Sequence, residues 1–122
     1  MRIKEEKMNG QLVNLLTEAR RAQITYEKFS QKQVDACVCM VGKVVYDNAA
    51  ELAIDAVAET GMGNVNDKTL KNQSKARNVW NHLKNKKSIG VIEPKDAEGI
   101  ITVAKPVGVV GAVTPTTSPT MT

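Results

Sequence analysis

Residues 107–119 read VGVVGAVTPTTSP, an apolar run followed directly by a loop of hydroxyl-bearing residues and prolines. Such an apolar run is typical of a strand buried on both faces, which needs neighbouring strands to pair with and helices to cover it. Only Thr120, Met121 and Thr122 follow the loop, so no covering element comes after it. We therefore expect the chain to be the front part of a larger protein.

The first half of the chain predicts helices. Apolar residues from Leu12 to Tyr26 recur at helical spacing and form one stripe. Ser30 and Gln33 form a capping box, which predicts a second helix directly after Ser30. The side chains expected on the inward face of this second helix are those of Val34, Cys37, Val38, Val41, Val44 and Val45.

Two more helices are predicted before residue 87. Asn48 can cap a third helix together with Glu51, and Gly61 suits a left-handed helix end. The segment Asn64–Asp67 offers the N-cap of a fourth helix. Its expected apolar contacts are Leu70, Val79, Trp80 and Leu83.

The sequence after Lys87 changes to strand composition. SIGVIE and IITVA, joined by the turn-rich stretch from Pro94 to Gly99, predict a β-hairpin. Lys105-Pro106 interrupts the next apolar run, so Val107–Val113 is expected as a separate strand. The predicted fold class is α/β, with four amino-terminal helices, a hairpin and the first strand of an incomplete sheet domain.

The net charge of +4 is unevenly distributed, because residues 68–87 hold seven basic side chains and no acidic one. A basic stretch of this kind is one mark of a nucleic-acid-binding surface. The segment has one aromatic residue, no arginine cluster and no recognisable reading motif. We therefore favour a solvated helix face beside an acidic neighbour, and disfavour nucleic acid as a partner.

Cys37 and Cys39 are the only cysteines, and a single residue separates them. That spacing does not suit a zinc knuckle, so no metal site is expected, and both are predicted to be reduced helix residues that pack as small hydrophobes. The amino terminus resembles neither a signal nor a transit peptide, and no apolar stretch is long enough to span a bilayer. A cytoplasmic protein without membrane contact is expected.

The loop after residue 113 carries the candidate chemistry. A buried strand that ends in Thr-Pro-Thr-Thr-Ser-Pro places hydroxyls at the carboxyl end of a strand, where open α/β sheets bind their ligands. Pro115 and Pro119 restrict the backbone and hold these hydroxyls in place. Hydroxyls are weak nucleophiles without an adjacent base, so the loop is interpreted as a positioning element.

The chain resembles the amino-terminal quarter of the CoA-acylating aldehyde dehydrogenases. The resemblance covers nearly all of the sequence from Ala19 on, and ETGMG and KPVGVVGAVTPTT carry it most specifically. Among these enzymes it is most similar to the succinate-semialdehyde type, followed by the acetaldehyde and sulfoacetaldehyde types. The resemblance implies conversion of a small aldehyde, CoA and NAD or NADP into an acyl-CoA and NAD(P)H, in a homo-oligomeric enzyme.

The resemblance also implies roles for individual residues. Val113, Thr114, Pro115 and Thr116 would line the nicotinamide cofactor after the first strand of a Rossmann-like domain. Thr117 and Ser118 would contact the oxyanion or the substrate, although acylating relatives usually read Thr-Thr-Asn-Pro where this chain has Thr116-Thr117-Ser118-Pro119. Neither cysteine matches the nucleophile of the family, so the 122-residue piece is expected to be inactive alone.

The expected domain division follows from the same resemblance. Residues 1–107 would form the helical layer and the hairpin, and residues 108–122 would supply the first cofactor-domain strand and the active-site loop. The alternative is a free-standing small binding protein that uses the basic helix 68–87. Two observations distinguish these hypotheses. One is whether Val107–Val113 is exposed or buried, and the other is whether the chain binds nucleic acid with a salt-dependent affinity.

Overall fold

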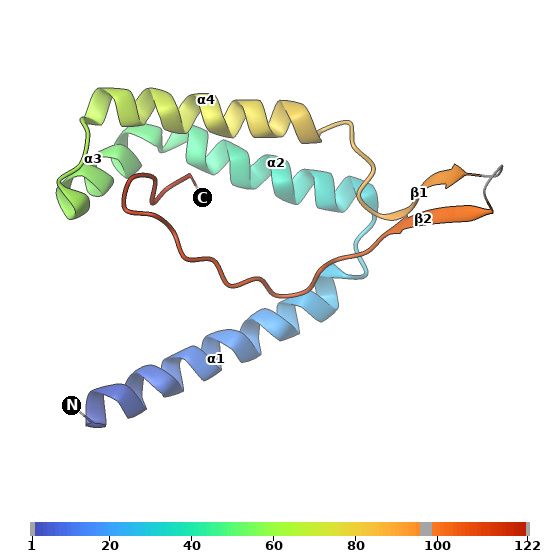
Figure 1. Ribbon diagram of the computed structural model, residues 1–122, viewed down its shortest axis with the longest axis horizontal. Coiled ribbons are helices and arrows are strands. Elements are labelled where there is room, and N and C mark those ends of the chain that lie inside the picture. The colour runs from blue at the N-terminus through green and yellow to red at the C-terminus, as the bar shows by residue number, and fades with distance from the viewer. Residues whose placement is uncertain (1, 96–98, 122) are drawn as a thin grey trace. The chain divides into compact units, whose positions relative to one another are not determined.

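A computed structural model describes residues 2–95 and 99–121, with side chains described for residues 10–93 and 99–121. The chain divides into two compact units (Figure 1). The first unit combines Met1–Gln31 with Ser88–Gly111, and the second combines Lys32–Lys87 with Ala112–Thr122. The four predicted helices and the hairpin are all present.

The first unit contains helix α1 (Arg2–Tyr26) and an antiparallel hairpin of β1 (Gly90–Lys95) and β2 (Ile100–Ala104). The strands pair from Gly90 with Ala104 to Lys95 with Ile100, and the register shifts between Val91 and Glu93. The predicted turn began at Pro94, but Pro94 and Lys95 lie within β1; residues 96–98 of that turn lie outside the described residues.

One glutamine side chain, that of Gln31 directly after Ser30, binds the residues that lead into the hairpin. The Oε1 atom of Gln31 accepts from the backbone N–H groups of Ser88 at 2.9 Å and Ile89 at 3.2 Å. Its Nε2 donates to Oγ of Ser88 at 2.9 Å. These contacts join residues 57 and 58 positions apart, so they hold the first unit together as tertiary structure.

The predicted strand Val107–Val113 has no hydrogen-bonded strand partner in the described part of the chain. Its backbone is irregular, and Val107 and Val113 are 90% and 97% exposed. The first part of the apolar stripe of α1 is also uncovered, because Leu12, Leu15 and Leu16 are all exposed, whereas Ala19 and Tyr26 are partly buried. A strand forms only where a neighbour satisfies its backbone groups, and the two hairpin strands pair with each other instead.

The second unit packs three helices, α2 (Gln31–Asp47), α3 (Ala49–Thr60) and α4 (Val65–Leu83). Helix α4 runs antiparallel along α2, and α3 contacts α4 (Figure 1). The buried residues are small: Ala49, Ala53 and Ala56 of α3 and Ala76 of α4 join Val34 of α2. Alanine allows helices to approach closely, and the low aromatic content of the chain, 3%, fits this kind of core.

The inward face of α2 differs from the prediction. Val34 is buried, but Val41 and Val44 are 67% and 54% exposed and Cys37 is exposed as well. The contact with α4 passes through Gly42, where an added Cβ would lie 3.8 Å from the carbonyl oxygen of Ala76. The packed stripe of α2 therefore runs from Val34 to Gly42 in two steps of four residues. Residues beside that stripe face outward.

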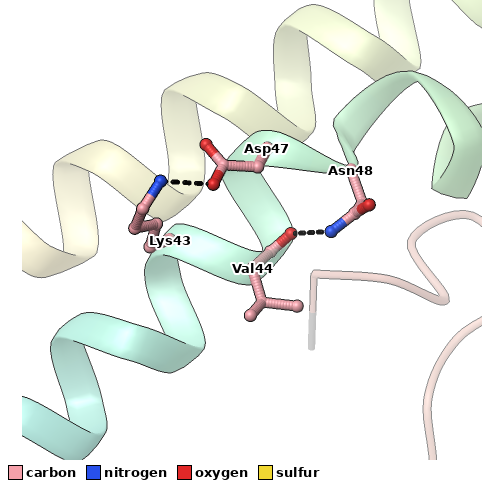
Figure 2. Close-up of polar contacts among 4 residues, drawn as sticks. All are labelled: Lys43, Val44, Asp47 and Asn48. Carbon is pink, nitrogen blue, oxygen red and sulfur yellow. Dashed lines mark hydrogen bonds and ion pairs between the residues drawn. The ribbon is translucent and has the colours of Figure 1, made fainter.

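The junction between α2 and α3 depends on Asn48, although not in the predicted way. The side chain of Asn48 makes no cap bond to α3; its Nδ2 donates to the carbonyl oxygen of Val44 at 2.8 Å and so completes the end of α2 (Figure 2). The backbone of Asn48, with φ −98° and ψ 18°, lies outside the extended region typical of an N-cap residue.

The other two predicted helix ends are confirmed. Gly61 ends α3 with φ 65°, and its N–H donates to the carbonyl of Val57. Asn64 begins α4 with an extended backbone, and its side chain accepts from the N–H of Asp67 at 2.9 Å. These two residues fix the short turn between α3 and α4.

An exposed ion pair lies near the end of α2. Lys43 donates a hydrogen bond to the carboxylate of Asp47 (Figure 2). This bond, together with the negative charge of Asp47, raises the pKa of Lys43 above its usual value. Both side chains are in contact with solvent, so the pair adds little to stability.

The alanine contact between α3 and α4 leaves no room for a larger side chain at Ala53, which is 0% exposed. We predict that Ala53→Leu lowers the free energy of unfolding by about 1–3 kcal/mol, because the added methylenes must displace α4. The measurement is thermal unfolding followed by circular dichroism. Ala58→Leu, the same change at an exposed position of α3, is the matched control and should stay within about 0.5 kcal/mol of the parent chain.

Candidate functional site: a hydroxyl-rich loop held by helix α4

The loop after residue 113 is compact rather than extended. The N–H of Ser118 donates to the carbonyl of Pro115 at 3.0 Å, and the N–H of Met121 donates to the carbonyl of Ser118 at 3.3 Å. Two successive turns result, and Pro119 is the second residue of the later turn, a position that proline favours. Residues 114–117 are exposed, and residues 118–120 are partly buried within the second unit.

Three side chains of α4 hold this loop. Nζ of Lys68 donates to the carbonyl oxygen of Thr117 at 3.3 Å, and Nζ of Lys71 donates to Oγ of Ser118. Oγ1 of Thr120 donates to Oδ1 of Asn72 at 2.9 Å. Since these partners are 47 to 49 residues apart in sequence, the contacts define a tertiary site.

Asn72 is the buried member of this group, with 2% of its surface exposed. While Oδ1 accepts from Thr120, Nδ2 donates to the carbonyl oxygen of Ala49 at 3.1 Å. Ala49 is the first residue of α3 and is itself buried. A single amide therefore connects the loop, α4 and the beginning of α3.

A shallow depression of about 300 Å³ lies beside these contacts. Asp67, Lys68, Lys71 and Thr117 are among the residues that line it. Asp67 is already engaged, because its Oδ2 accepts from Nδ2 of Asn64 at 2.7 Å. The local excess of positive charge at this end of α4 thus lies next to the predicted site residue Thr117.

The structure separates the predicted site residues into two groups. Thr117 and Ser118 contact α4 through a backbone carbonyl and a hydroxyl. Val113, Thr114, Pro115 and Thr116 are exposed. Thr117 is also exposed, so what distinguishes Thr117 and Ser118 from the four residues before them is their bonding to α4.

The cysteines do not join this site by any described contact. Both are free and lie on α2, where Cys37 is exposed and Cys39 is partly exposed. The prediction of two packed residues was therefore wrong for Cys37. The reason is that the buried stripe of α2 follows Val34 and Gly42, and Cys37 lies to one side of it.

Sequence reasoning missed Lys68, Lys71 and Asn72 as site residues. The basic segment was interpreted as a solvated face beside an acidic neighbour, but its first two lysines contact carbonyl and hydroxyl oxygens of the loop. One sequence signal could have identified Asn72. Asn72, Ala76 and Trp80 are spaced four residues apart, so this polar residue lies on the same face of the helix as a small and an aromatic packing residue.

Known proteins share both the sequence and the fold of this region. The chain is 47% identical over 108 residues to the succinate-semialdehyde dehydrogenase (acetylating) of Clostridium kluyveri, a match that covers 88% of this chain and 24% of that protein. The chain is homologous to acylating aldehyde dehydrogenases. The sulfoacetaldehyde dehydrogenase of an Acholeplasma species is 43% identical over 113 residues, covering 91% of this chain and 23% of the relative.

A solved acylating-type enzyme has the same arrangement of elements. The acetylating aldehyde dehydrogenase of Geobacillus thermoglucosidasius aligns with a TM-score of 0.69 and 40% identity over 72% of this chain and 20% of that structure. The chain thus spans about a quarter of the length of these acylating aldehyde dehydrogenases. No protein-family model matches it. Among the described residues, no helix is both long and apolar enough to cross a membrane.

The buried amide of Asn72 should dominate the stability of this site. We predict that Asn72→Leu lowers the free energy of unfolding by about 1–3 kcal/mol, because it removes the hydrogen bonds that join this buried amide to the carbonyl of Ala49 and to the hydroxyl of Thr120. Chemical denaturation gives the value. Asn78→Leu, at an exposed position of the same helix, is the control, and equal losses in the two variants would contradict the assignment.

Proposed function

We propose that the chain is the amino-terminal part of an NAD(P)-dependent CoA-acylating aldehyde dehydrogenase. The enzyme would convert an aldehyde, CoA and NAD or NADP into an acyl-CoA and NAD(P)H. The observation that carries this proposal is the 47% identity over 108 residues to an acetylating succinate-semialdehyde dehydrogenase. By the same likeness, succinate semialdehyde or a similar short aldehyde is the proposed substrate.

The exposed segment Val113–Thr116 is the proposed cofactor surface. It offers an apolar side chain that is 97% exposed, a proline and two threonine hydroxyls, which suit the apolar face and polar edge of a nicotinamide ring. NAD(P), when bound, would accept a hydride from the substrate. The contribution of these residues is to orient the ring and to keep one face of it away from water.

Thr117 and Ser118 are the proposed contacts to the substrate oxygen. In acyl-transfer chemistry, hydrogen-bond donors that are fixed before reaction stabilise the oxyanion, and the loss of one donor costs about a hundredfold or more in rate. The carbonyl of Thr117 and the hydroxyl of Ser118 are both anchored by lysines of α4, which supports a fixed loop. An anchored loop of this kind needs little rearrangement during the reaction.

We further propose that the 122-residue chain has no dehydrogenase activity by itself. The chemistry requires a cysteine thiolate that attacks the aldehyde carbon and later carries the acyl group to CoA. Cys37 and Cys39 lie on helix α2 and do not correspond to the nucleophile that the resemblance implies. The complete enzyme would be a cytoplasmic homo-oligomer in which further segments cover the exposed valines between residues 107 and 113.

The competing proposal, a small protein that binds nucleic acid through residues 68–87, has weaker support. Lys68 and Lys71 are partly buried and each already donates a hydrogen bond to the loop, so the exposed basic surface of the segment is smaller than its sequence suggests. The remaining basic residues are exposed and unaccompanied by an aromatic cluster. Salt-dependent binding of the chain to duplex DNA or RNA would favour this alternative.

The test of the main proposal has two parts. The purified chain, mixed with succinate semialdehyde, CoA and NAD or NADP, should produce no NAD(P)H above the protein-free control. In the source cells, an antibody against residues 10–90 should detect a polypeptide several times heavier than this chain, and immunoprecipitates of it should reduce NAD(P) in a CoA-dependent manner. A band at the mass of the chain itself, without such activity, would contradict the proposal.

A further inference from the structure

The loop is attached to α4 at three successive points, and the attachments differ in burial. Lys68 lies one helical turn before Lys71, and these two residues contact Thr117 and Ser118. Asn72, the next residue along α4, contacts Thr120. Neighbouring residues on a helix point about 100° apart, so Lys71 and Asn72 reach the loop from two directions.

We propose that Lys71 and Asn72 are positioning residues for the loop that carries Thr117 and Ser118. The inference rests on the proposed function of this loop as a cofactor and oxyanion surface. Lys71 fixes the hydroxyl of Ser118, and Asn72 fixes the exit of the loop at Thr120. Neither residue is required to touch the reacting atoms.

The two anchors work by different physical means. The Lys71 bond is charge-assisted and half-buried, so it is stronger than a bond between neutral groups but open to competition from water. The Asn72 side chain is almost fully buried, while its bond to Thr120 is partly buried, and losing that bond leaves a buried amide oxygen without a partner. Together they restrict both the lateral movement and the opening of residues 117–120.

The second bond of Asn72 couples the loop to the helical packing. Because its Nδ2 donates to Ala49, the amide is held in one orientation, and its Oδ1 is directed toward Thr120. The position of the loop therefore follows the position of α4 relative to α3. Any change that separates these two helices should release the loop as well.

Hydrogen–deuterium exchange of the whole chain, read by mass spectrometry, tests the role of Lys71. The reporters are the loop amides of Ser118 and Met121, which are bonded to Pro115 and Ser118. In Lys71→Met, loop fragments should exchange about threefold to tenfold faster, because the half-buried bond from Lys71 to Ser118 is lost and water replaces it only in part. Fragments from α4, residues 65–83, should keep their parent rate.

Four further variants separate positioning from general destabilisation. Lys71→Arg, which retains a cationic donor, should restore the slow loop exchange. Lys75→Met, the same change one turn further along α4 at an exposed site, should leave it unchanged. Thr120→Val should accelerate loop exchange, whereas Thr102→Val on an exposed position of β2 should not.

The outcomes are decisive without any assay of activity. Equal loop exchange in Lys71→Met and Lys75→Met, or failure of Lys71→Arg to restore protection, overturns the role of Lys71. Parent-like loop exchange in Thr120→Val overturns the role of Asn72. The proposed enzymatic function would survive either result, since it is tested by the CoA-dependent activity of the larger polypeptide; conversely, its failure would leave the anchoring intact.

Discussion

The second unit depends on the satisfaction of one buried amide. Asn72 is almost completely excluded from water, and a buried polar side chain is tolerated only where its donors and acceptors are bonded. Its two bonds reach a helix start 23 residues away and a loop hydroxyl 48 residues away. The alanine contacts between α3 and α4 bring these groups within reach, so the apolar packing and the polar bridge require each other.

The features that sequence reasoning predicted well are those set by neighbouring residues. Ser30, Gly61 and Asn64 mark helix boundaries through local backbone preferences, and the observed helices begin or end beside them. Turn residues likewise predicted the hairpin, apart from the two residues that extend β1. Asn48 shows the limit of such reasoning, because two adjacent helices compete for the same side chain and the end of α2 receives its hydrogen bond.

The features that sequence reasoning missed depend on partners that are distant in the sequence. The inward face of α2 is selected by Gly42 against α4, and neither periodicity nor composition identifies which of several valines will be covered. The loop from Thr114 to Pro119 was recognised as a site from its hydroxyls and prolines. The lysines that hold it were not, because a basic run in sequence carries no information about which oxygen atoms will face it.

The alanine interface of α3 has a thermodynamic consequence for the loop. Alanine has no side-chain rotamers to lose, so the contact of Ala49, Ala53 and Ala56 forms without the side-chain ordering entropy that larger residues incur. The separation of the helices is then set by backbone atoms and not by a choice among rotamers. Asn72, which anchors Thr120, therefore has a single well-defined location. Thermal fluctuation of neighbouring side chains adds little variation to that location.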